Sequence, residues 1–196
     1  MRSLFTYIIK PKGNRYNNTK DVDGKELILN SDNYQFKHVN REAIIVGLPA
    51  AENTMLKEGD TILVHHNVFR RWKDIRGVEK NSKAYYKDDM YFVFQDQIFA
   101  YKRDNMWRPL QGYCFVKPIK PYSKINVNKE EPLMGVVKHS DGTIAKNTLV
   151  GFKPNSECEF IIDNERLYRV LSKFITIKYE YQGEEEEYNP SWLQSS

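Results

Sequence analysis

The apolar residues of this chain come in short runs of four to six, bounded by residues that favour turns. Residues 43–46 and 61–64 are two such runs, while Asp141-Gly142 and Asp163-Asn164 are two of the turn signals. Runs of this length are typical of β-strands, because an amphipathic helix needs apolar residues three and four apart over ten residues or more. The aromatic content of 13% comes mainly from Tyr and Phe, which suit pleated, half-buried strands. We therefore predict an all-β protein with no long helix.

The two halves of the chain resemble each other. Residues 5–11 and 112–118 both end an aromatic and β-branched segment with Lys-Pro, and proline ends a ladder because it has no N–H to donate. Near the end of each half, residues 89–98 align without a gap on 166–175. Self-similarity of this kind indicates two copies of one supersecondary unit.

The strands between these landmarks complete the predicted architecture. We equate residues 43–47 with 134–137 as middle strands, and 61–64 with 158–162 as later strands. The fold that we predict is two small β-barrels in tandem, followed by a flexible acidic tail. The barrels span 1–103 and 104–181, and the tail is 182–196, with Glu184 to Glu187 expected to repel one another and stay extended.

Composition excludes several classes of protein. The longest apolar runs are far below the roughly 20 residues that a membrane-spanning helix needs, and the first ten residues read as a strand with no small-residue cleavage site, so we expect a cytoplasmic protein. Cys114 and Cys158 lie in predicted strands without metal-ligand spacing, and we interpret both as reduced thiols. We expect no metal and no cofactor.

The polar region 12–41 contains three consecutive apolar residues, Leu27, Ile28 and Leu29. Its flanks, 14–25 and 30–41, are almost entirely polar, and a region of about thirty residues with so little apolar content is usually functional or disordered. We interpret 12–41 as a mobile loop that presents the tripeptide to another protein. The alternative is that the tripeptide is a strand of the barrel core.

The order of these landmarks resembles the chaperonin-10 (GroES) co-chaperonin family. The landmarks are a strand that ends in Lys10-Pro11, a polar loop with an apolar tripeptide, a strand that ends in Val46-Gly47, a Glu58-Gly59-Asp60 strand start, and the closing segment 96–100. Each is short and unspecific, and the resemblance rests on the ordered set. It covers about the first hundred residues well, and the second half through its strands alone.

The resemblance implies a ring, expected to be a heptamer, that caps a GroEL-type chaperonin whose own subunits bind ATP or ADP. It implies that Leu27, Ile28 and Leu29 dock in an apolar groove of the chaperonin, flanked by Gly24, Lys25, Glu26 and Asn30. The ring would enclose an unfolded client protein. We interpret the divergence from the family as that of a bacteriophage protein acting in the host cytoplasm, with a capsid protein as client.

The chain departs from the family pattern in three places. Residues 47–55 are short where the family has a longer roof hairpin. Residues 65–87 form an extra basic segment with seven Lys or Arg against two acidic residues. The loop of the second half, 120–131, offers only Ile125 and Val127 in place of an apolar tripeptide, so we expect it not to bind the chaperonin.

Two other functions remain open. An open barrel could bind single-stranded nucleic acid through aromatic residues interleaved with cations, and a tandem barrel with arms could serve in virion assembly. The residues that would stack on bases are Phe69, Trp72, Tyr85 and Tyr86; the contact candidates on the basic segment are Arg70, Arg71, Trp72 and Lys73.

An enzyme is not expected. The four histidines are scattered, the adjacent pair His65-His66 should point to opposite faces of a strand, and neither a P-loop nor a nucleophile elbow occurs in the sequence.

Overall fold

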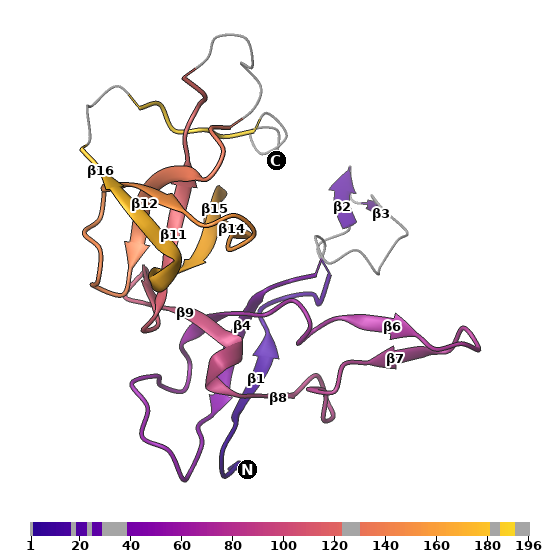
Figure 1. Cartoon of the computed structure of the whole chain (residues 1–196). Helices are drawn as coiled ribbons and strands as arrows, with labels where there is room; N and C mark the ends of the chain where they lie inside the picture. The colour runs from indigo at the N-terminus through magenta and orange to yellow at the C-terminus, as the bar shows by residue number, and fades with distance from the viewer. Residues whose placement is uncertain are drawn as a thin grey trace. The chain divides into compact units, whose positions relative to one another are not determined.

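The computed structural model describes residues 2–16, 19–22, 25–28, 39–122, 130–180 and 185–190. The described residues form an all-β protein, as predicted, in which helical structure is limited to 3-10 turns such as η2 (Gln95–Gln97) and η4 (Ser172–Phe174). The chain divides into two compact units, Met1–Met106 and Trp107–Ser196 (Figure 1). No helix among the described residues is long and apolar enough to cross a membrane.

Unit 1 is built on an antiparallel sheet in which strands distant in sequence are neighbours. Its strand order is β10-β9-β5-β4-β1-β8. The strands are β1 (Tyr7–Pro11), β4 (Glu42–Gly47), β5 (Thr61–Val64), β8 (Tyr91–Val93), β9 (Ile98–Arg103) and β10 (Met106–Pro109), where the chain passes into unit 2. The inward side chains, among them Tyr7, Ile9, Ile62 and Tyr91, are fully buried.

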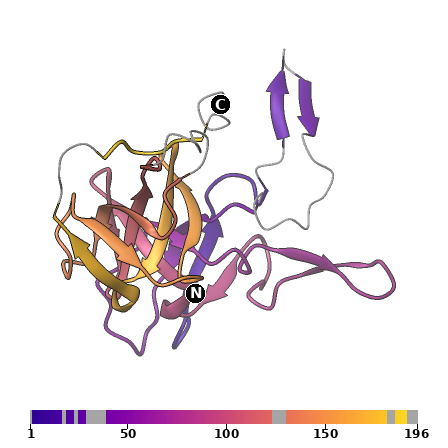
Figure 2. The same cartoon turned by 45° about the horizontal axis from the view of Figure 1, so that its top comes forward.

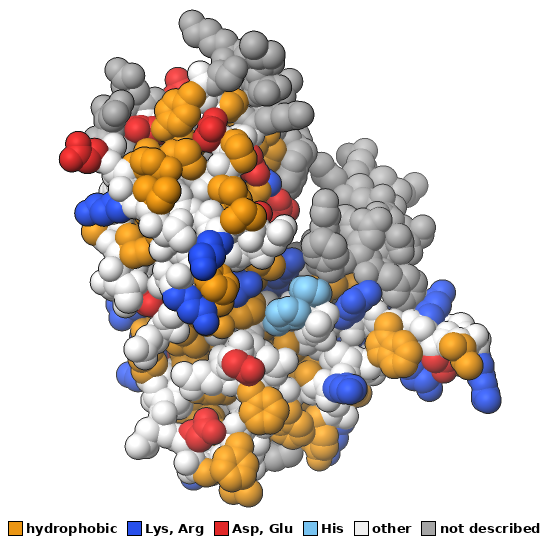
Figure 3. Space-filling view, in the orientation of Figure 1, with side chains coloured by type: hydrophobic (Ala, Val, Ile, Leu, Met, Phe, Trp, Pro, Cys, Tyr) orange, Lys and Arg blue, Asp and Glu red, His pale blue; other side chains and the backbone are white. Residues whose placement is uncertain are grey.

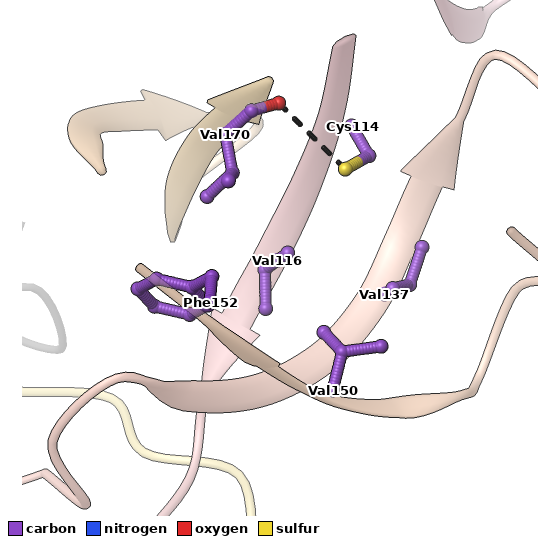
Figure 4. Close-up of a cluster of buried hydrophobic side chains, with 6 residues drawn as sticks. All are labelled: Cys114, Val116, Val137, Val150, Phe152 and Val170. Carbon is purple, nitrogen blue, oxygen red and sulfur yellow. Dashed lines mark hydrogen bonds between the residues drawn. The ribbon is translucent and has the colours of Figure 1, made fainter. Parts of the chain in front are cut away.

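Unit 2 is built on a second sheet, with the order β14-β15-β11-β12-β13-β16. The strands are β11 (Tyr113–Pro118), β12 (Met134–Ser140), β13 (Leu149–Phe152), β14 (Cys158–Ile162), β15 (Glu165–Leu171) and β16 (Ile175–Tyr179). Side chains from β11, β12, β13 and β15 converge on one apolar cluster (Figure 4). Its buried members are Cys114, Val116, Val137, Val150, Phe152 and Val170.

Five strands follow the same order in both sheets. β9-β5-β4-β1-β8 of unit 1 corresponds to β16-β13-β12-β11-β15 of unit 2. The register shifts at the same place, between Ile8 and Ile9 in β1 and between Phe115 and Val116 in β11. The aligned segments 89–98 and 166–175 both run strand, 3-10 turn, strand.

One predicted equivalence is wrong. The counterpart of Thr61–Val64 is β13, because each of these strands pairs with the middle strand of its sheet. Residues 158–162 form β14, an edge strand that pairs with β15. Among the described residues no pairing joins the two edges of either sheet, so both sheets are open, and closed barrels are not confirmed.

Part of the predicted acidic tail lies against unit 2. The N–H of Tyr188 donates to the carbonyl of Pro118 at 2.8 Å, and the N–H of Lys120 donates to that of Glu186 at 2.7 Å. Lys120 and Lys138 form ion pairs with Glu186 and Glu187, respectively. Two of the four glutamates of the charge block are therefore paired with lysines, and residues 186–188 lie along residues 118–120 instead of extending away from them.

The docked segment also covers a buried cation. The side chain of Lys117 is 2% exposed, and its Nζ donates to Oδ1 of Asn189 at 2.5 Å. Burial lowers the pKa of Lys117 below its ordinary value, although Glu165 and Glu187 oppose the shift. The hydrogen bond that Lys117 donates to Asn189 replaces part of the hydration that this ammonium loses.

Candidate docking site

The region between β1 and β4 leaves the sheet from a buried base. The N–H of Asn40 donates to the carbonyl of Arg15 at 2.9 Å, and Tyr16 and Val39 form an antiparallel bridge. The Nδ2 of Asn40 donates to the carbonyls of Lys12 and Asn14, both at 2.8 Å. Arg15, Tyr16, Val39 and Asn40 are all buried. Residues 12–16 and 39–41, predicted as part of a mobile loop, are instead the anchored ends of a narrower region, 17–38, which we call the excursion.

Within the excursion the chain forms a two-stranded sheet of its own. β2 (Thr19–Val22) pairs with β3 (Lys25–Ile28), so that Lys20 lies opposite Leu27 and Asp21 opposite Glu26. This sheet is separate from both six-stranded sheets. Of the predicted docking residues and their flanks, Lys25, Glu26, Leu27 and Ile28 are therefore in β3, whereas Gly24, Leu29 and Asn30 lie outside the described residues.

The middle of the basic segment 65–87 forms a β-hairpin. β6 (Arg71–Lys73) pairs with β7 (Glu79–Asn81), and both views show this hairpin extending away from the sheet of its unit (Figures 1 and 2). The turn between the strands is closed by Asp74, whose Oδ1 accepts from the N–H groups of Arg76 at 2.9 Å and Val78 at 3.0 Å. Gly77 has φ +76°, a conformation that glycine adopts without strain.

The hairpin is attached to the base of the excursion. Arg15 donates from Nη1 to Oδ1 of Asn81 at 2.8 Å and from Nη2 to the carbonyl of Phe69 at 2.9 Å. The N–H of Arg71 donates to the hydroxyl of Tyr16 at 2.6 Å, and its guanidinium lies 6.0 Å from the centre of that ring. The residues just before the excursion are thus held by the inserted segment, a contact that the sequence did not indicate.

The contact candidates on the basic segment have different surroundings. Arg70 and Lys73 are exposed, Trp72 is 49% exposed, and Arg71 pairs with Glu79 at 3.1 Å. Phe69, predicted as a base-stacking residue, is fully buried with its ring edge against Tyr91. Tyr85 is half-buried against the same ring, whereas Tyr86 is 44% exposed. Phe69 cannot stack on a base.

The two adjacent histidines lie together, which corrects the expectation of opposite faces. The strand ends at Val64, and the N–H of Val68 donates to the carbonyl of His65 in the turn that follows. The rings of His65 and His66 are stacked with centroids 4.2 Å apart. Burial, with the positive charges of His65, Arg41 and Arg70, lowers the pKa of His66 to about 4. The described residues contain no group of three or more His, Cys, Asp or Glu that could hold a metal.

The corresponding connection in unit 2 is shorter, and its middle, 123–129 with Ile125 and Val127, lies outside the described residues. Its following residue, Glu130, forms an ion pair with Arg166 and accepts from the hydroxyl of Tyr168 at 2.5 Å. This end of the connection is therefore attached to β15.

Comparison with known proteins gives no assignment. The chain matches no protein-family model, and no curated protein matches it significantly.

Proposed function

We propose that this protein is a co-chaperonin that caps a GroEL-type chaperonin. The observation that carries the proposal is the strand pair β2–β3, which holds Leu27 and Ile28 outside both six-stranded sheets on a buried base. A segment with that composition that contributes no strand to a core sheet is suited to binding a groove on another protein. The chain itself performs no catalysis, and ATP or ADP is bound by the chaperonin.

One excursion per chain binds too weakly to act alone. Burying Leu27, Ile28 and Leu29 contributes about 1.5–3 kcal/mol for each side chain, while ordering a loop costs about 1–2 kcal/mol for each residue. Several excursions on one ring bind together, because the first contact raises the effective concentration of the others. We therefore propose a ring of identical chains, with seven as the number that suits a sevenfold partner.

The shared strand order of the two sheets supports the tandem arrangement in this proposal. Each chain contributes two related β units, which we propose to be barrel-like, and the first unit carries the docking excursion. The enlarged ring encloses an unfolded client, which we propose to be a phage capsid protein, in the cytoplasm of the host.

The test is co-migration on size-exclusion chromatography with a bacterial chaperonin, in the presence and absence of ATP or ADP. The test variant carries Leu27→Ser, Ile28→Ser and Leu29→Ser, and the matched control carries Ile177→Ser, an exposed apolar residue on β16. We expect nucleotide-dependent co-migration of the wild type and the control, and none of the triple variant. If the wild type does not co-migrate with bacterial or cognate chaperonin, the proposal is wrong.

A second candidate function is binding of single-stranded nucleic acid. It is favoured by two half-exposed aromatic residues of the basic segment, Trp72 and Tyr86, with Nζ of Lys87 5.4 Å from the centre of the Tyr86 ring. The affinity of such a protein for nucleic acid falls steeply as the salt concentration rises. The serine substitutions at 27–29 would leave this affinity unchanged. Binding to an oligothymidylate at increasing salt, with a Trp72→Ala variant, distinguishes the two candidates.

A further inference from the structure

The β6–β7 hairpin is an insertion relative to the second unit. In unit 1 the backbone of 84–86 lies beside β8. The N–H of Phe92 donates to the carbonyl of Ala84, and the N–H of Tyr86 donates to the carbonyl of Met90. Residues 84–86 occupy the position that β14 has beside β15 in unit 2. The connection that leads to this position spans 153–157 in unit 2, but 65–83 in unit 1. The sheet therefore does not require the hairpin.

One face of the hairpin holds the base of the excursion. Arg71 and Asn81 are cross-strand partners, and side chains directly opposite each other lie on the same face of a ribbon. Asn81 binds Arg15, and the guanidinium of Arg71 lies over the ring of Tyr16. This face therefore contacts the rest of unit 1 at the base of the hairpin.

The other face presents apolar side chains to solvent. Trp72 is paired with Lys80, and Val78 precedes Lys80 by two residues, so by strand alternation Trp72 and Val78 belong to the face opposite Arg71 and Asn81. Trp72 is 49% exposed, Val78 is 50% exposed, and Ile75 in the turn is fully exposed. We call these three residues the hairpin tip.

The hairpin tip has a defined turn, and it is surrounded by positively charged residues. Asp74 closes the turn with two backbone hydrogen bonds, so the apolar side chains are presented by a built turn. Residues 70–87 contain seven Lys or Arg and two acidic residues, and Figure 3 shows blue and orange side chains together along the projecting hairpin. An exposed apolar cluster of this kind marks an interaction site when it is ringed by charge.

We propose that the hairpin tip is a second contact with the same protein that binds the excursion, and that this partner offers an acidic surface with an apolar socket there. This inference rests on the proposed function. Arg15 and Tyr16, which immediately precede the excursion, contact the base of the hairpin, so the excursion and the hairpin leave unit 1 from neighbouring points. The positive charge selects an acidic partner, and Ile75 and Val78 favour a protein socket because aliphatic side chains offer no aromatic ring for bases to stack on.

The experiment measures the dissociation constant of fluorescently labelled full-length protein for a bacterial GroEL-type chaperonin with ADP. The test variant is Ile75→Ser/Val78→Ser, and the matched control is Ile161→Ser on β14, which is 48% exposed and lies in unit 2. Because each buried aliphatic side chain contributes roughly a tenfold change in affinity, we expect the test variant to bind at least about tenfold more weakly. The control should stay within about twofold of the wild type.

The charge requirement is tested with Arg76→Glu, which lies in the same turn and has an exposed side chain. We expect weaker binding at low salt and a smaller difference from the wild type at high salt, because exposed charges are screened. Unchanged circular dichroism and melting of each variant show that only surface side chains were altered.

Three results would overturn the inference. If the serine variant at 75 and 78 binds normally while the triple variant at 27–29 does not bind, the second contact is wrong and the proposed function stands. If the wild type does not bind the chaperonin at all, both are wrong. If the wild type binds an oligothymidylate or phosphatidylserine vesicles and Ile75→Ser/Val78→Ser abolishes that binding, the tip serves a different class of partner.

Discussion

His66 illustrates how one turn changes the chemistry of a side chain. The sequence pattern would place His65 and His66 on opposite faces of a strand, but β5 ends one residue earlier and the rings stack. Burial and the neighbouring cations keep His66 neutral in the folded state until the pH reaches about 4. The unfolded side chain takes up a proton near its ordinary pKa of 6.5, so protonation favours the unfolded chain between these two values.

We therefore expect the free energy of unfolding to fall by on the order of 2 kcal/mol as the pH decreases from about 6.5 to about 4 because of His66. The stability that depends on neutral His66 is fully present above the pKa of the unfolded side chain, and it is lost as the pH falls toward the pKa of the folded one. A His66→Asn variant, which does not titrate, should show a shallower pH dependence in urea denaturation experiments over this range. Parallel pH profiles of the variant and the wild type would contradict this account.

Residue type alone could not predict which aromatic residues of the basic segment are exposed. Phe69 and Trp72 stand among the same cations in the sequence. The structure buries Phe69 against Tyr91 and leaves Trp72 half-exposed, because the chain turns at 65–68 before the hairpin begins. Burial at this scale depends on tertiary contacts, which local pattern does not contain.

At the level of elements, the strands that end in Lys-Pro and the paired strand–turn–strand segments were predictable from the sequence. β13 was missed, since Leu149, Val150, Gly151 and Phe152 are all buried and show no alternation. The sequence of β14 alternates more clearly, which is why the pattern favours 158–162 over β13 as the counterpart of residues 61–64. The β6–β7 hairpin was read only as a charged segment, because a three-residue strand with exposed side chains has no apolar periodicity.

β11 and β12 approach each other closely enough at Gly135 to exclude a side chain. A Cβ there would lie 2.4 Å from the carbonyl oxygen of Lys117 and 2.6 Å from Cγ1 of Val116. We expect Gly135→Ala to destabilise unit 2 by about 2–4 kcal/mol, since backbone must move. The change is measured as a shift in the midpoint of urea denaturation, followed by circular dichroism.

Gly47→Ala is the matched control, on a middle strand of unit 1. Its Cβ would meet Cδ1 of Ile8 at 3.2 Å, and the end of that side chain can move, so we expect a loss below about 1 kcal/mol. Equal destabilisation by the two substitutions would contradict the close approach at Gly135.

At the scale of the whole molecule, the sequence indicates two related halves with a boundary after residue 103. The structure divides after residue 106. The sequence does not indicate that residues 185–190 lie against unit 2. Four consecutive glutamates predict repulsion, whereas Lys120 and Lys138, which neutralise two of them, are distant in sequence. Long-range ion pairs of this kind follow from the fold and cannot be inferred from local charge.

If each chain of a ring contributes one excursion, chaperonin binding should fall more steeply than the fraction of functional excursions. We expect rings assembled from equal parts of wild-type chain and the triple serine variant at 27–29 to retain well below half of the chaperonin affinity, because avidity depends on several simultaneous contacts. The measurement is co-sedimentation with chaperonin and ADP across a series of mixing ratios. A linear decrease would show that each excursion binds independently.

The unequal connections of the two units bear on the history of the chain. Thirty residues separate β1 from β4, whereas fifteen separate β11 from β12. When a gene segment is duplicated, a role performed by one copy releases the other from selection for that role. The second copy is then free to diverge wherever only the first is under functional constraint. Sequence drift among descendants should therefore be greater in residues 119–133 than in the base formed by Arg15, Tyr16, Val39 and Asn40.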